Sequence, residues 1–333
     1  MRGEGAIATH PVMDLQRTSE HWDSHHFSDD FLRAEWSFHP EAKARLHRQL
    51  GAPSREAWFH NTYLAGRSGL RALGVGVGRA VTEINILSLG GIDRYDLYDL
   101  SPAALADGKA YAESRGLGGK ANFICADFQL ADIPDGSYDV ITFIASLHHI
   151  EHLEPTLEKC RRALAPGGVL WAAEYIGPDY FDYPAEHTML ARKMFPLLDP
   201  AIRKTWIPEL LFPSVADVIA VDPTESVHSS DIPRAMRAVF KDVTIIPTYG
   251  TFAAILFWGL NYDPLWDTAE GNMAVRHIME LDTALIDSGA LPHYFAYLIA
   301  RRPTRRQALA RAIGLDPYGQ TYRKLQRLLH RAR

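Results

Sequence analysis

Cysteine is almost absent from this chain of 333 residues. Its two cysteines, Cys125 and Cys160, are too few for a disulfide framework or for a metal site built from several thiolates. Long apolar runs are absent as well, because no stretch approaches the roughly 18 consecutive apolar residues of a membrane-spanning helix. The first residues, MRGEGAIATHPVMDL, lack the basic and apolar segments of a secretory signal. These absences predict a soluble, cytoplasmic protein.

Low-complexity segments and internal repeats are also missing, and 47% of the residues are hydrophobic. A large core can therefore be buried, which excludes a disordered, collagen-like or coiled-coil chain. The length allows one elaborated α/β domain or two small ones.

Charge is distributed unevenly along the chain. Residues 301–333 carry ten Lys or Arg and one acid, Asp316, whereas the rest has 25 basic and 39 acidic residues, a net charge of −14. Such a tail can attract nucleic acid, phospholipid or a phosphate-linked substrate. The favoured interpretation is a solvated helix that offsets the acidic body. We expect no DNA partner, and RNA is kept only as a rival. Peripheral membrane contact through the tail stays an open alternative.

The pattern of apolar residues divides the chain into parts. Residues 1–69 show helical patches, and residues 70–175 alternate short apolar runs with amphipathic segments, which indicates βαβ units on a parallel sheet. Strands are expected at about 71–75, 94–99, 121–125, 138–143 and 168–175. Residues 176–240, rich in proline and aromatics, are expected to cap a site at the carboxyl ends of the strands.

Two apolar runs, VTIIPTY and TFAAILFWGL, surround Tyr249-Gly250 and suggest an antiparallel pair of strands. The last seventy residues have helical spacing. We therefore expect an N-terminal helical segment (1–69), an α/β domain (70–260) and a C-terminal helical extension with the basic tail (261–333).

The first expected strand leads into a glycine-rich turn that contains Gly74, Gly76 and Gly78. Glycine is needed where a backbone approaches a ligand too closely for a Cβ atom. About twenty residues further on, the second strand ends at Asp99, and Leu100, Ser101 and Pro102 open a helix. An acid at this place can accept hydrogen bonds from both hydroxyls of a ribose, although it could also only cap the helix.

The third expected strand ends in Asp127-Phe128, where an acid followed by an aromatic can bond an adenine amino group and cover its ring. The fourth strand ends in Ala145-Ser-Leu-His148-His149-Ile, and an LAPGG turn precedes the fifth.

In this order the glycine loop, the two acids, the LHHI segment and the LAPGG turn resemble the motifs of class I S-adenosylmethionine (SAM)-dependent methyltransferases, over about residues 70–260. The resemblance implies a Rossmann-like α/β fold with a seven-stranded, mostly parallel sheet, an antiparallel last strand and a cap insertion. It implies SAM as cofactor and S-adenosylhomocysteine as product. The residues expected to contact the cofactor are Gly74, Gly76, Gly78, Asp99, Leu100, Asp127, Phe128 and Ala145.

One departure concerns the acid that stands two residues before the first glycine in the family's pattern. If Gly76 is that first glycine, Gly74 replaces the acid and Ala80 the third glycine; if Gly74 is the first, the acid's place is Ala72. The first register is preferred because it leaves a full strand. Glu83 in the following helix could compensate from another direction, and a non-catalytic scaffold of the same fold is the alternative.

The catalytic residues we expect are His149 first, His148 second, and then Glu174 at the end of the fifth strand. Histidine is a suitable base near neutral pH, although either one could only support the loop. Tyr175, Glu225 and His228 are expected to contact the substrate. No metal is expected: the cluster His21-x-Asp23-x-His25-His26 matches no strong metal signature and is taken as solvated.

Segments outside the sheet, such as WSFHP, EAWFHNTYL and DPTESVHSSDI, look similar to bacterial methyltransferases of surface-glycan and glycosylated-metabolite pathways. The resemblance therefore implies O-methylation of a hydroxyl on a sugar, glycoside or other small molecule, with histidine as general base. The rivals are an RNA methyltransferase and a binding or scaffold protein. A homodimer stays open.

Overall fold

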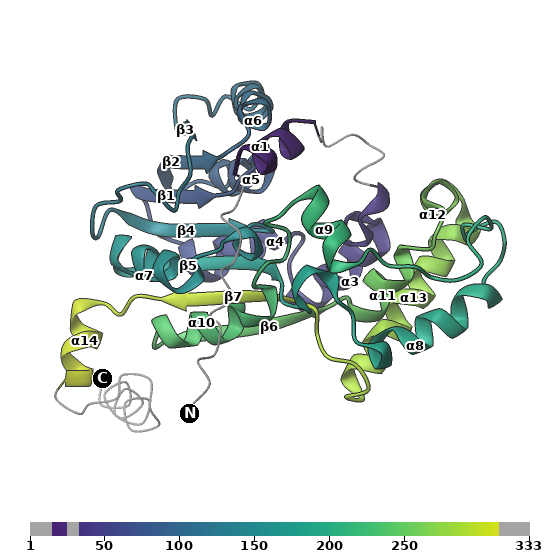
Figure 1. The fold of residues 1–333 in the computed structure, drawn as a ribbon. Coiled ribbons are helices and arrows are strands. Elements are labelled where there is room, and N and C mark those ends of the chain that lie inside the picture. The colour runs from purple at the N-terminus through teal and green to yellow at the C-terminus, as the bar shows by residue number, and fades with distance from the viewer. Residues whose placement is uncertain (1–14, 25–32, 313–333) are drawn as a thin grey trace, which may run out of the picture.

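The computed structural model describes residues 15–24 and 33–312 (Figure 1). Its centre is one seven-stranded sheet with the order β3-β2-β1-β4-β5-β7-β6. The strands are β1 (Leu70–Val75), β2 (Ile92–Asp99), β3 (Ala121–Cys125), β4 (Tyr138–Ile144), β5 (Leu164–Tyr175), β6 (Val243–Tyr249) and β7 (Phe295–Arg301). β7 is antiparallel to both of its neighbours, β5 and β6, and the pairs among β1 to β5 are parallel. The mostly parallel sheet with an antiparallel last strand is thus confirmed.

The place of that last strand differs from the expectation. Residues 251–260 were expected to be a strand, but α11 (Thr251–Phe257) is a helix, and β7 comes from residues 295–301 in the segment assigned to the helical extension. All but one of the α11 side chains are buried, and a run that is apolar on every side does not distinguish a buried strand from a buried helix. The boundary at residue 260 was therefore wrong, because the sheet closes with residues beyond it.

Helices cover both faces of the sheet. One face packs on α4 (Arg55–Phe59), α5 (Val81–Ser88) and α6 (Pro102–Ser114), where Phe59 stacks on Trp171 with ring centroids 4.6 Å apart. The other face packs on α7 (Leu153–Ala163) and α10 (Ile232–Val239). None of the helices in the described ranges is long and apolar enough to cross a membrane.

A second group of helices has an apolar core of its own beside the sheet, on the right in Figure 1. It comprises η1 (Trp36–Phe38), α3 (Pro40–Leu50), α8 (Ala185–Met194), η5 (Phe195–Leu197), α11, α12 (Tyr262–Asp267) and α13 (Ala269–Asp287). The remaining short helices are α1 (Leu15–Ser24), η2 (His60–Leu64), η3 (Leu147–His149), η4 (Asp179–Phe181), α9 (Val215–Val221), η6 (Ser229–Asp231) and α14 (Arg305–Ala312). The helical group therefore draws on the N-terminal segment and on residues beyond 250, not only on the expected insertion. Most of the basic tail lies outside the described residues.

Asp282 joins this helical group to the end of β6. Its buried carboxylate accepts hydrogen bonds from the backbone N–H of Gly250 (2.8 Å), Phe252 (2.8 Å) and Ala253 (3.2 Å), and it pairs with buried Arg45 at 2.9 Å. Three backbone donors and a guanidinium thus depend on one carboxylate, which explains why the chain turns into a helix after Gly250.

Replacing Asp282 with alanine is expected to lower the free energy of unfolding by about 3–5 kcal/mol, because it leaves a buried cation and buried donors unpaired. Urea denaturation measures this change. Exposed Asp287→Ala on the same helix is the matched control and should cost less than about 1 kcal/mol. Equal effects of the two substitutions would contradict this role.

Candidate active site

The turn between β1 and α5 brings the backbone close to the end of β4. Gly76 and Gly78 have φ angles of +62° and +50°, and Ala80 adopts +50°. A Cβ atom on Gly76 would lie 2.6 Å from the Cβ of Ser146, so no larger residue fits. These conformations support the register in which Gly76 is the first glycine and Ala80 stands in place of the third.

Glu83 fills the space beside Gly74. A Cβ atom at Gly74 would lie 2.6 Å from Val77 Cγ1 and 3.3 Å from Glu83 Cγ. The Glu83 side chain is buried, accepts a hydrogen bond from Thr142 Oγ1 at 3.4 Å, and burial raises its pKa to about 7. Gly74 stands where the family's pattern has an acid, and the carboxyl group next to it belongs to Glu83 of α5.

Asp99 ties the end of β2 to the glycine turn. Its Oδ2 accepts the N–H of Gly78 at 2.6 Å, and its Oδ1 accepts the N–H of Ser101 at 2.8 Å. Burial raises the pKa of Asp99, while these backbone donors act in the opposite direction. Each carboxylate oxygen keeps a lone pair for a further donor.

The two residues of the second acidic motif lie differently from each other. Asp127 Oδ1 accepts the N–H of Gln129 at 2.8 Å and is partly exposed. The ring of Phe128 is 3% exposed and packs in the core near Tyr98 and Phe143. This corrects the expectation that the Phe128 ring covers an adenine, because the ring is buried against the side chains of the sheet and is not available to a ligand.

Helix α1 lies next to this cofactor-side end of the sheet. Ser19 Oγ donates to the Leu100 carbonyl at 2.9 Å, and Asp23 Oδ1 accepts the Ser101 hydroxyl at 2.6 Å. On the other side, Trp22 Nε1 donates to Asp222 Oδ2 at 3.1 Å. Local sequence patterns could not predict these contacts, because the partners are separated by 78 to 200 positions.

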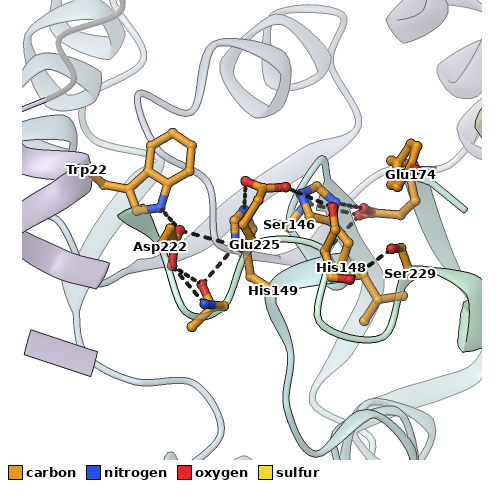
Figure 2. Close-up of polar contacts among 12 residues, drawn as sticks. Trp22, Ser146, His148, His149, Glu174, Asp222, Glu225 and Ser229 are labelled. Atoms are coloured by element: carbon orange, nitrogen blue, oxygen red, sulfur yellow. Dashed lines mark hydrogen bonds and ion pairs between the residues drawn. The ribbon is translucent and has the colours of Figure 1, made fainter. Parts of the chain in front are cut away.

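His148, just after β4, and Glu174, near the end of β5, form a buried pair (Figure 2). His148 Nδ1 lies 2.7 Å from Glu174 Oε2, while Glu174 Oε1 accepts the N–H groups of Ser146 (3.0 Å) and Leu147 (2.9 Å). Burial lowers the pKa of His148, but the bond to Glu174 outweighs it, and the pKa ends above its usual value. Glu174 therefore holds the loop and orients the imidazole.

His149 lies beside His148, with ring centroids 4.4 Å apart. Its Nδ1 is 2.9 Å from Thr224 Oγ1, and this hydroxyl donates to Asp222 Oδ1 at 2.8 Å. Burial, followed by the charge of His148, lowers the pKa of His149. Each ring is thus anchored through Nδ1 and presents Nε2 to the same side.

Glu225 faces both of these Nε2 atoms. Its Oε1 is 3.7 Å from His148 Nε2, and its Oε2 is 3.8 Å from His149 Nε2. The N–H of Val227 donates to the His148 carbonyl at 3.1 Å, which fixes the Glu225 loop against η3. Glu35, just before η1, is exposed but lies near enough for the charge of Glu225 to act on it: desolvation and that charge raise its pKa to about 7.

Of the predicted residues, the structure thus brings His148, His149, Glu174 and Glu225 together. Tyr175 does not join them, because its hydroxyl donates to the Pro178 carbonyl at 3.1 Å and its ring packs on Phe181 and Phe295. His228 stands at the start of η6, where its charge acts on Asp231. Asp222 and Thr224, which support the site from the same segment as Glu225 and His228, were not predicted, and no local pattern points to Glu35.

The sequence of the sheet region matches one family model, described as "Methyltransferase domain", over residues 72–172. This segment is a methyltransferase domain. It includes the glycine turn, Asp99, Asp127 and the histidine pair.

The methyltransferase domain is also similar to curated proteins. A sterol 24-C-methyltransferase of Gibberella zeae is 30% identical over 131 residues, covering 37% of this chain and 33% of that protein. A ubiquinone/menaquinone biosynthesis C-methyltransferase of Ectopseudomonas mendocina is 32% identical over 82 residues, covering 25% of this chain and 32% of that protein. The match therefore spans about a third of these relatives.

Solved structures show the same fold at low identity. A phosphoethanolamine N-methyltransferase of Haemonchus contortus has a TM-score of 0.52 at 13% identity, covering 88% of this chain and 61% of that one. A geranyl diphosphate C-methyltransferase of Streptomyces coelicolor A3(2) has a TM-score of 0.50 at 15% identity, covering 90% and 100%. The Rossmann-like class I methyltransferase fold is thus confirmed.

Proposed function

We propose that this protein transfers a methyl group from SAM to a hydroxyl group of a small polar molecule. The observation that carries the proposal is the position of Ser146, which belongs to both halves of the site. Its Oγ donates to the Val75 carbonyl at 2.6 Å beside the glycine turn, and its N–H donates to Glu174, which orients His148. A cofactor-binding turn and a carboxylate–histidine pair are therefore held against each other.

The residues at the ends of β1, β2 and β3 fit SAM. The turn at Gly76 leaves a cradle that a Cβ atom would fill, and Asp99 keeps acceptor positions for two ribose hydroxyls. Asp127 would accept the adenine amino group, and the backbone at Leu100 and Ala145 would border the ligand. When bound, SAM supplies a methyl group on a positively charged sulfur, and the chain's task is to position it.

On the acceptor side we assign the proton of the hydroxyl to His148 Nε2. Glu174 accepts only, so Nδ1 of His148 carries the proton and Nε2 is free to take another, as in carboxylate–histidine pairs of other enzymes. His149, which the sequence put first, lacks a directly bonded carboxylate. Glu174 is a positioning residue, since three donors occupy it.

The carboxylates around this space favour a polar, uncharged or cationic acceptor. Glu225 and Glu35 would bond hydroxyl groups, as on a sugar or glycoside, while buried Asp222, whose oxygens already accept bonds from Thr18, Trp22 and Thr224, adds negative charge that would repel the phosphates of RNA. The relatives favour a second candidate, methylation of carbon, because the matched curated proteins are named C-methyltransferases. His148 would then remove the proton of the methylated carbon.

The test combines binding and product analysis. Isothermal titration should show micromolar binding of S-adenosylhomocysteine, and labelled SAM with a panel of glycosides, phenols and prenyl compounds should give an O-methyl product by NMR. A C-methyl product would replace the first candidate by the second. Binding without turnover on any acceptor, or no binding at millimolar ligand, would favour the scaffold interpretation.

A further inference from the structure

The side chains of His148, His149 and Glu225 converge from two loops onto one small space (Figure 2). One ligand-type atom from each residue lies within 4.8 Å of the other two. The distances from Glu225 to the imidazole nitrogens, 3.7 and 3.8 Å, are too long for hydrogen bonds. They are close to the separation of about 3–3.5 Å between atoms that share an ion at about 2.1 Å.

The hydrogen bonds fix where the protons lie on both rings. Glu174 accepts at 2.7 Å, so His148 carries its proton on Nδ1. Thr224 gives its hydroxyl proton to Asp222, so it accepts from His149 Nδ1. In the neutral rings, both Nε2 atoms are therefore bare lone pairs directed at a carboxylate, an arrangement that repels unless a proton or a metal cation lies between nitrogen and oxygen.

The supports around these three side chains are those of a metal centre. Metal-bound histidines usually donate their other N–H to a carboxylate or another acceptor, and bound carboxylates are themselves hydrogen-bonded. Here Glu174 and Thr224 anchor the rings, and Ser226 Oγ donates to Glu225 Oε1 at 2.8 Å. Within the described residues, the ion pairs of Glu174, Asp222 and Glu225 are made with histidine alone, so no Lys or Arg of that part of the chain balances their negative charge.

We propose that His148 Nε2, His149 Nε2 and the Glu225 carboxylate bind a divalent transition-metal cation. Two imidazoles and one carboxylate suit Mn²⁺, Fe²⁺, Co²⁺ or Zn²⁺ better than Mg²⁺, which prefers oxygen. This proposal departs from the expectation that the chain has no metal site. It uses none of the N-terminal histidines, of which His25 and His26 lie outside the described residues, although Trp22 of that segment contacts the His149 ring with centroids 5.6 Å apart.

Three protein ligands leave coordination positions for oxygen atoms of an acceptor. The bound cation would polarise a hydroxyl and favour loss of its proton to solvent, whereas in the ion-free protein His148 takes that proton itself. This use of the cation rests on the proposed function, but its binding does not.

The experiment uses the untagged full chain, treated with EDTA and dialysed. Titration with Co²⁺ should show one cation per chain and the visible absorption of a nitrogen-ligated site. Glu225→Gln and His149→Ala should each weaken binding at least about 100-fold, because loss of outer supports alone costs about 10–100-fold. Exposed His152→Ala is the matched control and should bind as the parent does. Thermal melting checks that each variant is folded.

Failure to bind Co²⁺ or Zn²⁺ at millimolar concentration, or equal binding by parent and Glu225→Gln, would overturn the site. Titrating the same samples with S-adenosylhomocysteine separates the two proposals. Nucleoside binding without metal binding contradicts only this inference, and metal binding without nucleoside binding contradicts only the proposed function.

Discussion

Substitution of Asp99 by alanine is expected to weaken binding of S-adenosylhomocysteine by about 100- to 1,000-fold. The variant would lose the hydrogen bonds from two ribose hydroxyls to the carboxylate, each worth about 1.5–3 kcal/mol when the acceptor is charged. The N–H groups of Gly78 and Ser101, which now donate to Asp99 at 2.6 and 2.8 Å, would lose their acceptor. The glycine turn would then lose its fixed position. Isothermal titration measures the loss.

Asp93 provides the matched control for this experiment. It lies on the same strand but is exposed, and its partner Lys120 is 3.8 Å away, so Asp93→Ala should leave the affinity within about twofold. Asp99→Asn, which keeps one acceptor oxygen, should lose less affinity than Asp99→Ala. Unchanged affinity in a folded Asp99→Ala variant would remove the ribose role and favour a protein that binds no SAM.

The second large effect is expected for His148→Asn, which should lower kcat by about 100- to 10,000-fold, the range of general-base contributions. The asparagine amide can still donate to Glu174, so the loop that this carboxylate holds should keep its place. What disappears is Nε2, the atom that takes a proton or binds a cation. Affinity for S-adenosylhomocysteine should stay within about threefold, because Asp99 and the glycine turn are unchanged.

Turnover with labelled SAM and the best acceptor measures this change, and His152→Ala, three residues beyond η3, is the control that should retain full activity. A His148→Asn variant with more than a third of the parent kcat would exclude His148 from the chemistry. A loss of nucleoside affinity as large as the loss of turnover would indicate a structural role instead.

Most of the sheet could be predicted from the sequence, because helices separate the strands from β1 to β5, except between β3 and β4, and these strands end in motifs. β7 could not: its residues Phe295–Arg301 form a short apolar run after a long helix, and the more apolar run at 251–257 was mistaken for it. Asp282 favours the helix at 251–257, because its carboxylate accepts hydrogen bonds from the first N–H groups of α11. These bonds join residues about 30 positions apart, so local patterns do not show them.

In the site, too, local patterns predict some residues, whereas others depend on contacts between distant parts of the chain. Asp99, His148, His149 and Glu174 follow directly from strand ends, since parallel strands bring these ends to one edge. Glu35 and Thr224 reach the site through the packing of other elements, and local patterns carry no information about such pairings. The order of the two histidines could not be predicted either, because it depends on which ring meets Glu174.

Ser146 imposes a constraint on how this site can vary. Its hydroxyl is bonded to β1, its amide to Glu174, and its Cβ occupies the space that a side chain at Gly76 would need. Position 76 therefore cannot gain a side chain unless Ser146 shifts. Because its N–H also donates to Glu174, which bonds His148, one buried serine links the glycine turn to the histidine pair, and a shift that makes room at position 76 would disturb both.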